Sequence, residues 1–212
     1  LVLARALGDQ FNIAMQLNNL GTLLHVEGQY SDAQPYYEES LQICQEIGYR
    51  KGQSIALSNL GEIACELGDY ERARPLFQQA LSIGQEIGDQ RTAVICLNNL
   101  GQIALALKDW ASASTYLAAA LRITSGIRAV SILFKVLVNA GAWLIHAQQT
   151  RKAAEVLGLV LEHAGAEQET KQLAQQLLDE NQIVPQTPDL ASLAAVVAEV
   201  LKDPSVLTRG PL

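Results

Sequence analysis

Apolar residues recur along this chain at helical spacings, and the whole pattern repeats. Leu17, Leu20 and Leu24 are separated by three and four residues, and Ala33, Tyr37 and Leu41 by four. These are the spacings of one face of a helix, and neither run alternates as a strand would. The period is 40 residues, as the matched glycines show: Gly21, Gly61, Gly101 and Gly141.

Each period holds two such apolar segments, joined at a Gly-x-aromatic turn. The turn is Gly28-Gln29-Tyr30 in the first period and Gly68-Asp69-Tyr70 in the second. Each period therefore predicts a helical hairpin. A fixed period of this length is typical of a stacked repeat, which buries its core between neighbouring copies. We expect an all-α solenoid of antiparallel helix pairs.

The pattern also predicts how the chain is divided. Residues 1–8 match the end of a second helix, which indicates the remnant of a preceding repeat and an excised fragment of a longer protein. Residues 166–202 are expected to form C-terminal capping helices, the first with Leu173, Leu177 and Leu178 on its inner side and the second starting at Thr187-Pro188-Asp189. Residues 203–212 are expected to be disordered. The repeats between these ends are assigned to 9–49, 50–89, 90–129 and a degenerate 130–165.

The first helix of each repeat carries two stripes. One is the packing face, with Leu17, Leu20 and Leu24 in the first repeat. The other follows a 4-3-4 spacing and forms a second continuous stripe on each helix. This second stripe comprises Met15, Asn19, Thr22 and Val26; Ile55, Asn59, Glu62 and Glu66; Ile95, Asn99, Gln102 and Ala106; and Lys135, Asn139, Ala142 and His146.

Composition narrows the class of protein. The net charge is −7 and no basic run is present, which argues against a nucleic-acid surface. No apolar run reaches membrane-spanning length and no signal peptide is recognisable. Three cysteines, an odd number without metal-ligand spacing, are expected to pack as small apolar groups in a reducing compartment. We therefore expect a cytoplasmic protein that binds neither a membrane nor nucleic acid.

No catalytic constellation is recognisable, so we expect no enzyme activity, metal or cofactor. The three histidines, His25, His146 and His163, show no metal-ligand spacing. Glu62 and Glu66 could be an acid–base pair, but without a nucleophile or lysine nearby a solvated face is the better interpretation.

Aromatic residues offer a few candidate anchors for a partner. Tyr37 and Trp110 occupy repeat-packing positions, which leaves Tyr36 and Trp143 as the open candidates.

These motifs resemble the tetratricopeptide repeat in its longer form of about 40 residues. The second repeat carries the family pattern as Leu57, Leu60-Gly61, Gly68-x-Tyr70, Ala73, Phe77 and Ala80-Leu81. Its Asn-Leu-Gly core is most similar to the kinesin-light-chain type. More loosely, the C-terminal part resembles the ends of large bacterial signalling ATPases and transcriptional activators, at Ala154-Glu155-Val156-Leu157-Gly158, Glu169-Thr170 and Val197-Ala198-Glu199-Val200-Leu201.

The resemblance implies a right-handed superhelix whose first helices line a concave peptide groove, and the family's groove positions fall on the second stripe. The four asparagines, Asn19, Asn59, Asn99 and Asn139, would then form a column of amides. Such amides suit an extended peptide, because each can donate to and accept from its backbone. Alternatively, they bond neighbouring helices and fix the superhelical pitch. Both interpretations stay open.

The resemblance also bears on the partner. The family's carboxylate clamp needs Lys or Arg in the groove, where Glu62 and Glu66 stand. A neutral or basic segment of a protein or peptide is therefore expected. We hypothesise a protein-interaction scaffold; the alternative is a ligand-sensing regulatory arm of a signalling ATPase or transcriptional regulator. Exposed solenoid ends could also give a homodimer.

Overall fold

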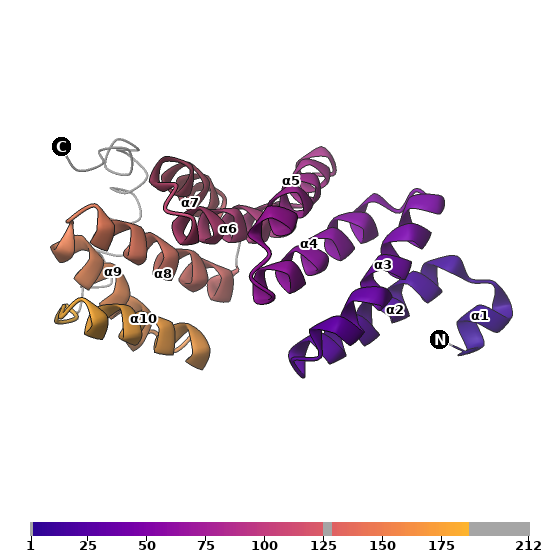
Figure 1. The fold of residues 1–212 in the computed structure, drawn as a ribbon, viewed down its shortest axis with the longest axis horizontal. Coiled ribbons are helices and arrows are strands. Elements are labelled where there is room, and N and C mark those ends of the chain that lie inside the picture. The colour runs from indigo at the N-terminus through magenta and orange to yellow at the C-terminus, as the bar shows by residue number, and fades with distance from the viewer. Residues whose placement is uncertain (1, 125–128, 187–212) are drawn as a thin grey trace. The chain divides into compact units, whose positions relative to one another are not determined.

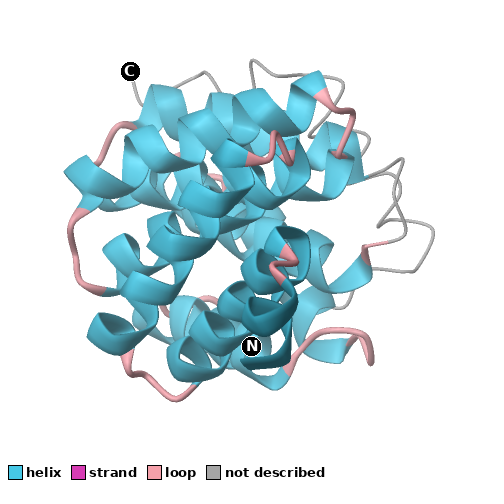
Figure 2. Ribbon diagram, turned by 90° about the vertical axis from the view of Figure 1, so that its right-hand side faces the viewer, coloured by secondary structure: helices cyan, strands magenta, loops and turns pink. Residues whose placement is uncertain are grey.

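The computed structural model describes residues 2–124 and 129–186, and these residues fold into helices joined by short loops (Figures 1 and 2). The all-α prediction is confirmed, because every element of the described residues is an α-helix. The helices are α1 (Val2–Leu7), α2 (Gln10–Val26), α3 (Tyr30–Glu46), α4 (Arg50–Glu66), α5 (Tyr70–Glu86), α6 (Gln90–Ala106), α7 (Trp110–Thr124), α8 (Val130–His146), α9 (Thr150–Glu162) and α10 (Gln168–Glu180).

The chain divides into two compact units, Leu1–Asn99 and Leu100–Leu212, with the boundary inside α6. In the first unit, α2 packs against α3 and α4 against α5 as hairpins, and α3 also packs against α4. In the second, α8 packs against α7 and α9, and α10 covers α8 and α9. The sequence order of helix pairs is thus also their packing order within each unit.

Aspartates cap the starts of some of the helices, and two of them, Asp69 and Asp109, stand one period apart. Asp9 and Asp69 are N-caps whose carboxylates accept hydrogen bonds from the backbone N–H groups of Asn12 and Arg72. Asp109 likewise accepts from the Ser112 N–H. Such caps satisfy one of the N–H groups that a helix start leaves unpaired. The second and third repeats therefore share a capping residue at the start of their second helix.

The turn between the two helices of a hairpin needs one residue with positive φ. Gly28 and Gly68 supply it in the first two repeats, at φ values of 76° and 75°. In the third and fourth repeats, Lys108 and Gln148 adopt the same conformation, at 59° and 58°. The backbone geometry of the turn is kept although its glycine is lost.

Two helices of a hairpin approach closely where the first carries glycine. A Cβ at Gly61 would lie 2.9 Å from the ring of Phe77, and one at Gly21 would lie 2.8 Å from the ring of Tyr37. In the second unit, a Cβ at Gly141 would overlap Leu157 in the same way. The Leu-Gly motif thus makes room for the large side chain of the second helix.

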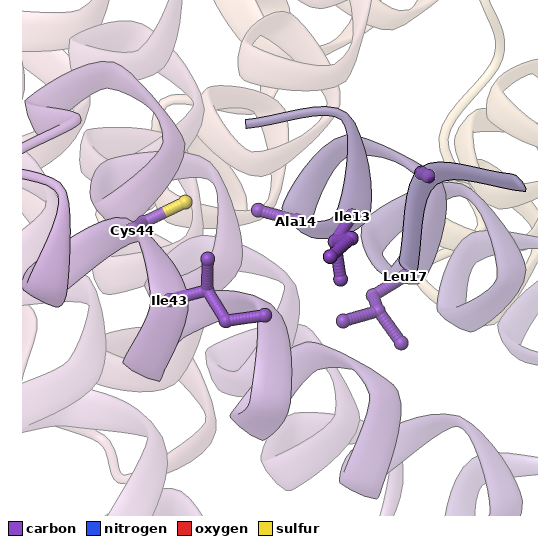
Figure 3. Packing of buried hydrophobic residues seen from close by; sticks show 6 residues of the cluster. Ile13, Ala14, Leu17, Ile43 and Cys44 are labelled. Atoms are coloured by element: carbon purple, nitrogen blue, oxygen red, sulfur yellow. The ribbon is translucent and has the colours of Figure 1, made fainter. Parts of the chain in front are cut away.

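The core of the first unit lies between consecutive helices. Figure 3 shows Ile13, Ala14 and Leu17 of α2 gathered with Ile43 and Cys44 of α3. The next cluster joins Ala33 and Tyr37 of α3 to Leu60 and Ile63 of α4. The expected packing face holds for Leu57, Leu60 and Ala64, which are all buried.

In α2 this face differs from the expectation. Leu17 is buried, but Leu20 is exposed and Leu24 only partly buried. The difference arises because the hairpin partner of α2 covers Leu17 but no described residue buries Leu20 as α3 buries Leu60.

The C-terminal part of the second unit has a helix where a cap was predicted, and its inner face agrees with the prediction in part. Leu178 is buried as expected, together with Ala174, and Leu177 is half-buried, whereas Leu173 is exposed. After α10 the chain returns to α9, where the Gln186 N–H donates to the Ala154 carbonyl. The predicted helix within 187–202 and the tail 203–212 lie outside the described residues.

Candidate functional site

The second stripe is accessible along α2 and more enclosed on the helices that follow it. Met15, Asn19 and Thr22 of α2 are exposed. On α4, Ile55, Asn59 and Glu62 are half-buried and Glu66 is exposed, while Ile95 and Asn99 of α6 are half-buried. Within the first unit, the stripe therefore offers polar groups that neighbouring helices fix in place and solvent still reaches.

Two of the predicted asparagines are held by the preceding repeat. The Asn59 Nδ2 donates to Asn18 Oδ1 at 2.9 Å. The Asn99 Nδ2 donates to Glu62 Oε1 at 3.4 Å. Each bond crosses from one first helix to the next, so it links consecutive repeats. The interpretation of the asparagines as bonds between neighbouring helices therefore holds for Asn59 and Asn99.

These bonds also orient the amides. In both cases the amide nitrogen turns to an acceptor of the preceding repeat. The carboxamide oxygens of Asn59 and Asn99 accept no hydrogen bond within the described part of the chain. A half-buried acceptor that is held in place and unused is suited to a backbone N–H of a bound segment.

Asn18 was missed by the analysis of the sequence, which placed it on neither stripe. It precedes Asn19 by one residue, and successive residues of a helix point in directions 100° apart. The repeated pairs Asn18-Asn19, Ser58-Asn59 and Asn98-Asn99 were the available signal. A polar residue before the asparagine in three repeats indicates a second polar row beside the column.

The carboxylates of α4 have partners rather than a catalytic arrangement. Glu62 accepts from Asn99, and Glu66 Oε2 accepts from the Tyr30 hydroxyl at 3.3 Å. Tyr30 belongs to the Gly-x-aromatic turn of the preceding hairpin. Both carboxylates therefore take part in contacts between repeats, and this geometry gives no support to an acid–base pair.

In the second unit, two of the predicted groove residues are engaged by their neighbours. The Lys135 ammonium lies 3.2 Å from the Glu167 carboxylate. The His146 ring stacks on Trp110, with ring centroids 3.5 Å apart and planes inclined by 10°. Gln102 is exposed and Asn139 half-buried. Lys135 and His146 thus help to hold the unit together.

One proposed anchor is wrong. Trp143 is buried with 2% of its surface exposed, and its indole Nε1 donates to the Trp110 carbonyl at 3.0 Å. It occupies the core position that Ile63 fills in the second repeat, so an indole took the place of an aliphatic side chain. Tyr36 is half-buried and packs on the cluster of α1, α2 and α3.

The cysteines are free and held in unreactive surroundings. Burial, with a smaller contribution from the nearby Glu62 carboxylate, raises the pKa of Cys96 to about 12 and that of Cys65 to about 11. Thiolates are therefore scarce at neutral pH. Within residues 2–124 and 129–186, no cluster of three or more His, Cys, Asp or Glu side chains could hold a metal ion. In the same residues, no helix combines the length and the apolar character needed to cross a bilayer.

Two solved structures are similar to the chain. BtubC (BKLC) from P. vanneervenii matches with a TM-score of 0.58 and 22% identity, over 82% of this chain and 63% of that one. This chain therefore spans less than two thirds of that protein. YrrB, described as a TPR protein with an unusual peptide-binding site, matches with a TM-score of 0.52 and 16% identity, over 97% of this chain and 95% of that one. Identities this low show the fold alone.

Family comparison is more specific. No curated protein matches the chain significantly in sequence. The tetratricopeptide-repeat model matches residues 12–83 and 52–125. The resemblance of residues 154–201 to the ends of signalling ATPases falls outside these matches and stays a prediction. Because the matches together cover more than half of the sequence, and the matched residues form packed helix pairs, the chain belongs to the tetratricopeptide-repeat family.

Proposed function

We propose that this protein is an interaction module that binds an extended peptide or partner segment along the second stripe of its first helices. The observation that carries the proposal is the pair of oriented amides. Asn59 and Asn99 each bond the preceding repeat through nitrogen and keep an unused oxygen. Because each of these repeats carries one such asparagine, the acceptors follow one another at regular intervals, which suits the regularly spaced N–H groups of an extended segment.

The preferred segment is neutral or basic. Glu62 and Glu66 stand on the same stripe as Asn59, and this part of the stripe carries no Lys or Arg. A carboxylate-rich segment would meet like charges here, which costs affinity, whereas a Lys or Arg side chain would gain an ion pair. Exposed Asn19 and Met15 extend the same surface along α2.

A peptide array tests the proposal directly. The array presents neutral, basic and acidic peptides to the wild type and to Asn59→Ala/Asn99→Ala. We expect the wild type to select neutral or basic peptides and the variant to bind them at least tenfold more weakly. Equal binding by the two proteins would show that the asparagines are only scaffold and would overturn the proposal.

The control removes two amides elsewhere. Gln78 and Gln79 are exposed on α5, away from the stripe, so Gln78→Ala/Gln79→Ala should bind as the wild type does. Circular dichroism of all three proteins establishes that each is folded. Raising the salt concentration should weaken binding of basic peptides more than that of neutral ones.

A further inference from the structure

Helix α4 shows solvent only a narrow strip of side chains along most of its length. From residue 52 to residue 64, every residue is buried except Ile55, Asn59 and Glu62, which are half-buried. Along residues 92–99 of α6, every residue is buried except Ile95 and Asn99, which are half-buried as well. A segment that crosses the two helices here therefore touches little besides these side chains.

Isoleucine and asparagine occupy matched places in this strip. Ile55 precedes Asn59 by four residues, which is about one helical turn. Ile95 precedes Asn99 by the same interval. Consecutive first helices lie side by side, since the Asn59 and Asn99 amides each bond the preceding first helix. A row of isoleucines and a row of amides therefore run next to each other across α4 and α6.

The interval between the amides bears on the conformation of a bound segment. Packed helices have axes about 8–10 Å apart, so the amides of consecutive repeats recur at roughly that interval. A polyproline II helix has about three residues per turn and rises about 3.1 Å per residue, so the N–H groups on one side recur about every 9 Å. In a β-strand, the N–H groups on one side recur roughly every 6.6 Å. The polyproline II repeat matches the amides, and the strand repeat does not.

We propose that this strip binds a proline-rich segment in the polyproline II conformation, with a non-proline residue at every third position. The inference rests on the proposed function, since it uses the same acceptors. The N–H groups of the non-proline residues donate to the unused oxygens of Asn59 and Asn99. The prolines between them pack on Ile55 and Ile95. A polyproline II backbone makes no hydrogen bonds of its own, so these donors are available.

The narrowness of the strip also favours proline. An ordinary segment would bring N–H groups that lose water and find no acceptor, which costs affinity. Proline has no N–H group, and its ring restricts φ, so a proline-rich segment is already ordered before it binds. Glu62 follows Asn59 by three residues on the same strip, and its carboxylate favours Lys or Arg at the non-proline positions.

Three acetylated, fluorescently labelled peptides of equal length test the proposal by fluorescence polarisation. The first holds four Gln-Pro-Pro triplets. The second holds two Gln-Gln-Pro-Pro-Pro-Pro blocks, so it has the same composition but no two glutamines three residues apart. The third is all proline and offers no backbone N–H group. We expect the wild type to bind the first about tenfold or more tightly than the other two, which lose one or both hydrogen bonds.

Variants show whether the asparagines cause this preference. We expect Asn59→Ala/Asn99→Ala to bind the three peptides with nearly equal affinity. Gln78→Ala/Gln79→Ala, which alters two exposed amides of α5, should keep the preference of the wild type. Circular dichroism checks that both variants are folded and that the triplet peptide adopts the polyproline II conformation.

Equal binding of the triplet and block peptides by the wild type would overturn the proposal, and so would a preference that survives Asn59→Ala/Asn99→Ala. Selection of proline-free peptides from the array, without binding of the triplet peptide, would also overturn it, but would leave the proposed function standing. If the wild type bound neither the array peptides nor these three, both the inference and the proposed function would fail.

Discussion

The Asn59 amide nitrogen lies 2.9 Å from the amide oxygen of Asn18. Asn18 precedes Asn59 by 41 residues, which is one repeat and one further position. The bond ties α4 to α2 and leaves the Asn59 oxygen unused. A single contact between two amides thus serves both the stacking of repeats and the orientation of the proposed binding group. This double role separates Asn18 from residues that act only in packing.

Asn18 should therefore affect peptide binding without belonging to the column. We expect Asn18→Ala to weaken binding several-fold, because the Asn59 amide loses the acceptor that orients it. Asn18→Asp keeps an acceptor at this position and should bind nearly as the wild type does. Isothermal titration with a peptide selected on the array measures both. Equal affinity of Asn18→Ala and wild type would contradict an orienting role.

Replacing Gly61 by alanine should destabilise the fold, although alanine is the better helix former. Replacing a helical glycine by alanine usually stabilises by up to about 1 kcal/mol. Here the new Cβ would lie 2.9 Å from the Phe77 ring, and we expect a loss of roughly 1–3 kcal/mol from overpacking. Gly84 is the matched control, since a Cβ there would have no neighbour nearer than 3.5 Å. Urea denaturation should show opposite or clearly different effects of Gly61→Ala and Gly84→Ala.

The hairpin turn offers a substitution that should stabilise the fold. Lys108 adopts a φ of 59°, at the position where Gly68 stands in the second repeat. Because side chains make this conformation unfavourable by about 1 kcal/mol, Lys108→Gly should raise the free energy of unfolding by up to that amount. The reciprocal change, Gly68→Lys, should lower it. If Lys108→Gly and Gly68→Lys changed the free energy of unfolding in the same direction, the conformation of the turn would not be the cause of the changes.

Gly158 should hold the chain segment after α10 in place. A Cβ at this position would overlap the backbone of Gln186, and backbone cannot turn aside as a flexible side chain does. We expect Gly158→Ala to displace the segment and break the bond from the Gln186 N–H to the Ala154 carbonyl. Hydrogen exchange should then show faster exchange of the Gln186 amide, with the amides of α8 little changed. Unaltered protection of Gln186 would count against this contact.

His25 should make the first unit less stable in mild acid. Burial lowers the pKa of the folded His25 below its usual 6.5, and Glu66 opposes the shift only in part. As the pH falls, the unfolded chain therefore takes up the proton first. The stabilisation is complete above pH 6.5 and is lost as the pH falls through the folded pKa.

A variant isolates the contribution of His25. Its ring makes edge contacts with Tyr30 and Tyr37, which phenylalanine can keep without titrating. We expect His25→Phe to show a shallower loss of stability between pH 7 and 5 than the wild type, as followed by urea denaturation. Parallel pH profiles of the two proteins would exclude His25 as the source.

Much of the fold could be predicted from the sequence because a solenoid is built from local patterns. The 3.6-residue periodicity predicts each helix, and Gly28 and Gly68 mark the turns. The repeated Leu60-Gly61 motif indicates close packing of the paired helices. Such features depend on residues that are close in the sequence. Because each feature recurs at the same position of every repeat, it is supported by several independent occurrences.

Side-chain environments were less predictable. Trp143 looked like an open anchor and is buried, because the fourth repeat fills a core position with indole. Leu20 looked buried and is exposed, and on α10 the predicted Leu178 is buried but Leu173 is exposed, with Ala174 buried in addition. Periodicity gives the direction of a side chain on its own helix, but what covers it belongs to another helix.

By itself, the sequence determined the all-α repeat, its period and the family, because all three follow from residues that recur at fixed spacings. Only the tertiary structure decided that Asn59 bonds Asn18, that His146 stacks on Trp110, and that Tyr30 bonds Glu66. Each of these is a contact between side chains 36 or more residues apart. Contacts of this kind follow from how helices pack, because packing alone brings such distant residues within reach of one another.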